Sequence, residues 1–151
     1  MRGAAPDPLV YQRSVPRLLE LFAEARIRAT FFFVARDFPE QNAAAKAVAR
    51  AGHEVASHSL THPMPFRKLG KAALAAEIVE SKRRLEEACG AEVVGFRAPN
   101  WDMTERELPA LLEAGYRYDA SNYPSPFLLL ARGLLAAKGT PGRSSRSPSF
   151  R

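Results

Sequence analysis

The chain has 151 residues, of which 46% are hydrophobic and 25% are charged. These values are typical of one globular domain that buries its own core. The formal net charge of +6 would suit a nucleic-acid-binding protein. However, Lys138, Arg143, Arg146 and Arg151 all lie in the terminal segment 138–151, which contains no acid. The basic excess is therefore mostly a property of that segment, and we expect no nucleic-acid partner.

No transmembrane segment is expected, because no apolar run approaches the roughly 20 residues that cross a bilayer. The longest candidate, 127–137, is too short and contains Arg132. The first residues, MRGAAPDPLVYQRS, lack the apolar core of a secretory signal. The single cysteine, Cys89, cannot form an internal disulfide. The compartment and the oligomeric state therefore stay open, with the cytoplasm as the default.

Helical and strand patterns alternate in the first part of the chain. A proline suited to a first helical turn, followed by apolar residues at helical spacing, predicts a helix over 16–25. The aromatic-rich run 29–35 predicts a strand that is buried on both faces. A helix over 40–52, which ends at a glycine, and a strand over 53–57 follow.

The alternation continues in the second part. Apolar residues on one face predict a long helix over 71–90, again ending at a glycine. A strand over 92–96 follows, and then a T-x-x-E capping box predicts a helix over 104–115. A short strand over 116–120 completes the pattern. Alternating helices and strands indicate an α/β fold with mainly parallel strands.

The composition divides the chain into three parts. Residues 1–13 are expected to form an irregular N-terminal segment, and residues 14–137 the folded domain. Residues 138–151 are rich in Gly, Ser, Pro and Arg and have almost nothing to bury. They predict a disordered basic tail.

Two histidines, His58 and His62, directly follow a predicted strand. Neutral imidazole is a common zinc ligand, and an H-x3-H spacing places two rings on one face of a helical turn. The carboxyl ends of parallel strands are also where sites are commonly built. Alternatively, the two histidines are polar caps in a loop with neighbouring Ser and Thr residues. The spacing alone leaves both interpretations open.

Three further residues follow or end predicted strands. Arg97 would reach the same edge of the sheet as the histidines and could hold a carboxylate by two hydrogen bonds. Trp101 could form an apolar wall for a sugar ring, and Asp119 could orient an imidazole or Arg97. Each has an alternative role: a surface ion pair for Arg97, a core ring for Trp101, and a turn or cap for Asp119.

Taken in order, four segments resemble one family, the polysaccharide deacetylases (NodB homology, carbohydrate esterase family 4). ATFFFVARDFPE resembles the family's A-T-F-F strand, and AGHEVASHSLTH its G-H-E-x-x-x-H-[ST]-x-x-H metal motif. FRAPNWD resembles the R-x-P-x-[WFY] groove motif, and YDASNYPSP the Asp-containing segment that follows it. The resemblance covers about residues 14–128.

The resemblance implies a distorted (β/α) barrel, incomplete in this chain, that acts on N-acetylated polysaccharides or oligosaccharides. It implies one divalent metal, zinc first, with cobalt or nickel as alternatives, bound by an Asp and two His. His58 and His62 match the histidine ligands. Arg97 would orient the catalytic Asp, Trp101 would line the groove and Asp119 would tune the acid.

The chain departs from the family pattern in two places. The family's paired carboxylates, which supply a base and the third metal ligand, should precede Pro16, where Asp7 is the only acid. Asp7 is thus the one candidate for that ligand, without an acidic neighbour. No histidine follows His62, so the general acid has no counterpart. His53 matches a non-ligand position and is expected to be structural. The alternative to an enzyme is a non-catalytic fragment with a residual metal- or glycan-binding site.

Overall fold

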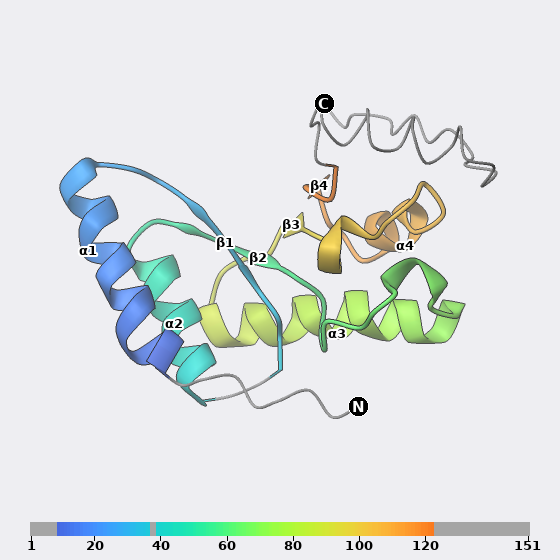
Figure 1. The fold of residues 1–151 in the computed structure, drawn as a ribbon, viewed down its shortest axis with the longest axis horizontal. Helices are drawn as coiled ribbons and strands as arrows, with labels where there is room; N and C mark the ends of the chain where they lie inside the picture. The colour runs from blue at the N-terminus through green and yellow to red at the C-terminus, as the bar shows by residue number, and fades with distance from the viewer. Residues whose placement is uncertain (1–8, 37–38, 123–151) are drawn as a thin grey trace, which may run out of the picture.

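The computed structural model describes residues 9–36 and 39–122. Its centre is a parallel sheet in which the strands follow one another in chain order (Figure 1). The strands are β1 (Thr30–Phe33), β2 (Glu54–Ser57), β3 (Gly95–Phe96) and β4 (Tyr118–Asp119). The described strands form an open sheet rather than a closed barrel. The α/β prediction with parallel strands is confirmed.

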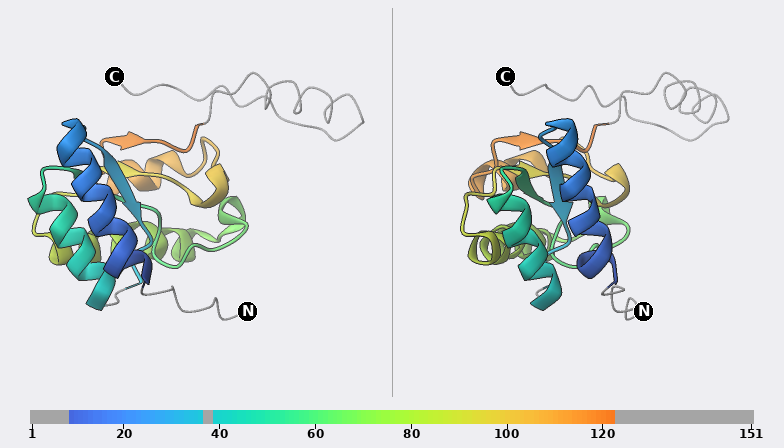
Figure 2. Two further views of the ribbon diagram at one scale, coloured as in Figure 1. Left: turned by 60° about the vertical axis from the view of Figure 1, so that its left-hand side comes forward. Right: turned by 90° about the vertical axis from the view of Figure 1, so that its left-hand side faces the viewer.

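Of the described α-helices, the first precedes β1, and the other three connect strands that lie next to each other in the sheet, as parallel pairing requires. These helices are α1 (Val15–Ala25), α2 (Pro39–Arg50), α3 (Lys71–Cys89) and α4 (Leu108–Glu113). A π-helical turn, Val10–Ser14, runs directly into α1. Figure 2 shows α1 and α2 side by side with β1 behind them, and α2 also packs on α3.

The strand register brings the carboxyl ends of the strands to one edge. Phe33, Ser57, Phe96 and Asp119 are paired in succession across the sheet. Residues that follow these positions, including His58 and Arg97, must therefore emerge at the same edge. This edge carries the candidate site.

One face of the sheet packs on the helices. The Phe31 ring meets Phe22 of α1 at a centroid distance of 6.0 Å, and the Ser57 hydroxyl bonds Ser81 of α3 at 2.9 Å. Phe96 is fully buried against Phe66 and Tyr116. Because side chains alternate along a strand, the intervening residues face the other way. They include Thr30, Phe32, Glu54 and Tyr118.

A polar network lies on that second face. The Glu54 carboxylate accepts hydrogen bonds from the hydroxyls of Thr30 (2.6 Å) and Tyr118 (2.7 Å). Tyr118 reaches Glu54 across Gly95, where an added Cβ would lie 2.2 Å from the phenol oxygen. Burial, reinforced by Glu54, raises the pKa of Tyr118 to about 12. Position 95 must therefore be glycine for β2 and β4 to be linked across β3.

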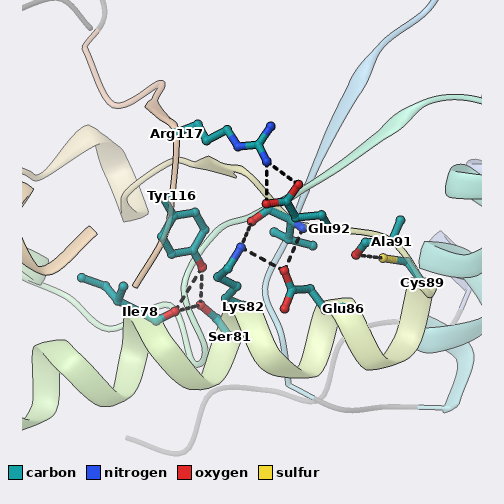
Figure 3. Close-up of polar contacts among 10 residues, drawn as sticks. Ile78, Ser81, Lys82, Glu86, Cys89, Ala91, Glu92, Tyr116 and Arg117 are labelled. Atoms are coloured by element: carbon teal, nitrogen blue, oxygen red, sulfur yellow. Dashed lines mark hydrogen bonds and ion pairs between the residues drawn. The ribbon is translucent and has the colours of Figure 1, made fainter. Parts of the chain in front are cut away.

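Helix α3 fastens the segments around β3 and β4 (Figure 3). The Lys82 ammonium donates a hydrogen bond to the carbonyl of Val93 and pairs with Glu86 at 2.9 Å. Glu86 in turn accepts the Val93 N–H at 3.1 Å. The Tyr116 hydroxyl donates to the Ile78 carbonyl at 3.1 Å. These contacts anchor on α3 the segments that lead into β3 and β4.

Several predicted boundaries differ from the structure. The strand expected to be buried on both faces has an exposed Thr30 and a half-buried Phe32, because no described helix covers its second face. The Glu107 carboxylate accepts the Thr104 N–H, as in a capping box, but it also accepts the Thr104 hydroxyl; the two residues close a turn, and α4 begins only at Leu108. The expected tail over 138–151 lies outside the described residues. None of the helices that the structure describes has the length and apolar composition needed to cross a bilayer.

Phe96→Ala should lower the free energy of unfolding by about 3–5 kcal/mol, because it leaves a cavity between Phe66 and Tyr116. Leu112→Ala is the control, since Leu112 is 54% exposed; it should change stability by less than about 0.5 kcal/mol. Urea unfolding followed by circular dichroism measures both. Equal effects of the two changes would contradict the assigned core.

Candidate metal-binding site

His58 is held directly at the carboxyl end of β2. Its backbone N–H donates to the carbonyl of Phe33 in β1 at 2.7 Å. Its ring Nδ1 lies 2.7 Å from the backbone carbonyl of Arg97, which follows β3. Because a carbonyl can only accept, Nδ1 must carry the proton. The lone pair of Nε2 is therefore available for a metal ion, an arrangement typical of histidine ligands.

His62 turns its ring toward His58. The ring centroids are 5.0 Å apart, with the planes at 67°. The expected helical turn between them is wrong: Ser59 (φ 68°) and His62 (φ 59°) both have left-handed backbone conformations. The Ser59 hydroxyl accepts the His62 N–H at 3.0 Å. The histidines thus converge through a strained loop, which spacing alone does not predict.

Electrostatics favours the neutral form of His58. Burial lowers the pKa of His58, and the nearby charges of His62 and Arg97 lower it further. The hydrogen bond to the Arg97 carbonyl opposes this shift without cancelling it. Neutral imidazole is the form that binds divalent metals.

The described residues offer two candidate ligands for a metal ion, His58 and His62. Two imidazoles that face each other suit zinc, but a catalytic zinc normally has three protein ligands. No group of three His, Cys, Asp or Glu side chains is close enough to share an ion within the described ranges. Asp7, the proposed third ligand, lies outside them. The donor set therefore fits two positions of a zinc site, and the third stays a prediction.

Arg97 emerges from β3 beside the histidines. Its guanidinium lies over the Phe32 ring, 4.1 Å from the centroid, and its Nε donates to the Ala120 carbonyl at 3.1 Å. It forms no ion pair with any carboxylate in the described part of the chain, so the alternative of a surface ion pair finds no support. Its role as an orienting residue for a carboxylate stays a prediction.

Trp101 lies on the turn that follows β3. The Pro99–Trp101 turn has left-handed conformations at Asn100 (φ 51°) and Trp101 (φ 53°). The tryptophan is 49% exposed, so the alternative of a core ring is wrong. An exposed ring at the site edge agrees with a role in sugar binding, which stays a prediction.

Asp119 ends β4 and fastens the turn after it. Its carboxylate accepts hydrogen bonds from the N–H (3.0 Å) and the hydroxyl of Ser121. The Ser121 hydroxyl also accepts the N–H of Ala98, which joins the segments after β3 and β4. Burial raises the pKa of Asp119, partly offset by Ser121 and by the charge of Arg97. Among the described residues, its hydrogen bonds are those of a turn; the orienting role stays a prediction.

His53 lies at the opposite edge of the sheet. Its Nδ1 accepts the Ala29 N–H at 3.2 Å, and its ring packs on Phe22 and Phe31 at centroid distances of 5.6 and 5.5 Å. A carbon-lined ring with its acceptor in use is structural, as predicted.

Glu77 was not predicted from the sequence. It is 8% exposed and accepts two backbone N–H groups of the histidine loop, those of Leu60 and Thr61, at 2.9 Å each. The signal in the sequence is weak: an acid beside Leu74 and Ile78 on the apolar side of a helix.

The family model described as polysaccharide deacetylase matches residues 7–118, about three quarters of the chain. The chain belongs to the polysaccharide deacetylase family. Members of this family are hydrolases that generally depend on a metal ion. The matched residues include the loop that carries His58 and His62.

Two curated relatives agree with this assignment. The chain is 29% identical to a peptidoglycan deacetylase of Helicobacter pylori over 107 residues, 71% of this chain and 36% of the relative. It is 31% identical to a chitooligosaccharide deacetylase of Sinorhizobium fredii over 111 residues, 73% of this chain and 49% of the relative. The chain thus spans about a third to a half of the length of these proteins.

Solved structures of the family share the fold. A polysaccharide deacetylase from Mycobacterium smegmatis matches with a TM-score of 0.65 and 33% identity, over 74% of this chain and 38% of that one. A mutant of a carbohydrate esterase family 4 pseudoenzyme from Bacillus anthracis, with restored activity, matches with a TM-score of 0.66 and 25% identity. That match covers 80% of this chain and 47% of the other.

In the metal-free protein, His58 should titrate below the ordinary histidine pKa of about 6.5. Its folded-state pKa is lowered, so its contribution to stability is present above the unfolded-state value and is lost as the pH falls through the folded-state value. NMR titration of the ring protons, with His58→Gln to assign the signal, measures this pKa. A midpoint at or above about 6.5 would show that burial does not outweigh the hydrogen bond to the Arg97 carbonyl, and would contradict the lowered pKa.

Proposed function

We propose that this chain carries the histidine part of the metal site of a hydrolase that removes N-acetyl groups from amino sugars of a glycan. The observation that supports it best is the convergence of His58 and His62, with Nδ1 of His58 tied to the Arg97 carbonyl. A structural loop would need neither the facing rings nor the free Nε2.

Zinc is the preferred metal, with cobalt or nickel as alternatives, since imidazole suits all of them. When bound, such an ion polarises the acetamide carbonyl and lowers the pKa of water. His58 would hold it through Nε2, His62 would supply the second imidazole, and Asp7 is proposed as the third ligand.

The other site residues would act on substrate and on carboxylates. The exposed ring of Trp101 offers an apolar surface against which a sugar can pack. Arg97 keeps its terminal guanidinium nitrogens unbonded by described residues, so they remain available for a carboxylate. Asp119 is close enough for the charge of Arg97 to affect its pKa, and its carboxylate would contribute to the electrostatic potential around Arg97.

The substrate class follows from the relatives. A peptidoglycan deacetylase and a chitooligosaccharide deacetylase both act, by name, on acetylated amino-sugar glycans. We therefore propose an N-acetylated polysaccharide or oligosaccharide as the substrate of this site.

A second candidate is a non-catalytic protein with a residual metal- or glycan-binding site. It is favoured by the described ranges, which hold two facing histidines but no cluster of three His, Cys, Asp or Glu side chains. The wild-type Bacillus anthracis neighbour is itself described as a pseudoenzyme of carbohydrate esterase family 4, so this fold also occurs without activity.

Calorimetric titration with zinc should show one ion bound per chain, and the response should disappear in His62→Ala. His53→Gln is a matched control, because glutamine can still accept the Ala29 N–H while the third histidine is removed. It should bind zinc like the unchanged protein. No response from the unchanged protein would rule out a metal site in this chain.

Acetate release from N-acetylated chito-oligosaccharides, with zinc or cobalt added, should depend on His58. His58→Ala is expected to abolish turnover, and Trp101→Ala to raise KM through loss of ring packing. Turnover that persists in His58→Ala would contradict the proposed role of His58 as a metal ligand. Zinc binding without any turnover would favour the second candidate.

A further inference from the structure

Every backbone N–H group from His58 to His62 has a hydrogen-bond acceptor. The five pairs are His58 with the Phe33 carbonyl, Ser59 with the Ser57 hydroxyl, Leu60 and Thr61 with Glu77, and His62 with the Ser59 hydroxyl. Complete pairing of consecutive N–H groups outside a helix or strand defines one loop conformation. Among these acceptors, Glu77 of helix α3 is the one side chain that comes from outside the segment 57–62.

Both oxygens of Glu77 are directed at the loop. Oε2 accepts the N–H groups of Leu60 and Thr61 at 2.9 Å each, and Oε1 accepts the Thr61 hydroxyl at 2.6 Å. The side chain is buried, and a buried carboxylate is costly unless hydrogen bonds compensate it. Here three donors do so, and all three belong to the segment between the two histidines.

The loop needs such an external support. Ser59 and His62 flank Leu60 and Thr61 with φ values of 68° and 59°, which are unfavourable for residues with a side chain. Without acceptors for the N–H groups of Leu60 and Thr61, this conformation would be higher in free energy than one in which water bonds these groups. The loop would then leave it. The His62 ring would then leave His58.

We propose that Glu77 is a positioning residue that holds the rings of His58 and His62 together before any metal binds. It acts through the backbone of Leu60 and Thr61 and does not touch the ion. The proposal rests on the proposed function only for its effect on metal binding, because the ring arrangement is a property of the metal-free chain.

The test uses NMR of the metal-free protein and zinc titration of the same samples. Glu77→Ala should remove the nuclear Overhauser effect between the rings of His58 and His62, and weaken zinc binding about 10- to 100-fold, as loss of support for a metal ligand commonly does. Glu87→Ala is the matched control: it lies on the same helix and its side chain is 63% exposed, paired with Arg83. It should leave both readouts unchanged.

Two further variants separate the acceptor role from general stability. Glu77→Met fills similar space without an acceptor, so it should lose the ring contact even if the alanine variant fails to fold. Glu77→Gln keeps a carbonyl oxygen for Leu60 and Thr61 and should retain the contact. The proposal is overturned if a folded Glu77→Met or Glu77→Ala keeps the ring contact, or if Glu77→Gln loses it to the same extent as Glu77→Met.

The outcomes also distinguish this proposal from the proposed function. If the unchanged protein binds no zinc, the metal site fails, while the ring contact in the metal-free variants still decides the role of Glu77. If zinc binds equally well to Glu77→Met and to the unchanged protein, the site stands and the positioning role does not.

Discussion

The parallel pairing of the four strands is the constraint on which the site depends. The strands end at one edge of the sheet in a row of paired residues, Phe33, Ser57, Phe96 and Asp119. The next residue of β2 and of β3 must therefore turn to the face away from the helices. His58 and Arg97 occupy these positions, so their proximity follows from register before any side-chain contact is made. The hydrogen bond from the His58 ring to the Arg97 carbonyl then fixes the ring within this frame.

The sequence predicted the order of helices and strands well, because helical periodicity and glycine stops are local signals. It predicted strand ends poorly. In the strand expected over 92–96, β3 comprises only Gly95–Phe96. The Val94 carbonyl still accepts the N–H of Tyr118, but Val93 bonds the Lys82 and Glu86 side chains of α3 instead of a strand. Local apolar pattern does not reveal such competition between a helix side chain and a neighbouring strand.

In the candidate site, too, local sequence signals predicted some features, while tertiary contacts determine others. The pair His58 and His62 was located from spacing and from its place after a strand, and the rings do meet. The loop geometry was not predictable, because the acceptor for Leu60 and Thr61 comes from Glu77, sixteen and seventeen positions along the chain. Arg97 and Asp119 were expected at the ends of strands and lie there, but their partners depend on tertiary packing. Asp119 bonds Ser121, and Arg97 lies on Phe32.

The bond between His58 and position 97 has a consequence for how this position can vary. The main chain of Arg97 orients the imidazole, while its side chain lies over Phe32 and leaves its terminal nitrogens unbonded by the described residues. The carbonyl and the side chain of Arg97 thus have separate roles, and a substitution changes only the second. A side chain of another kind at 97 would abolish the cationic contribution while the carbonyl kept the histidine tautomer. A homologue without this arginine can therefore still hold the histidine with Nδ1 protonated and Nε2 available for a metal ion.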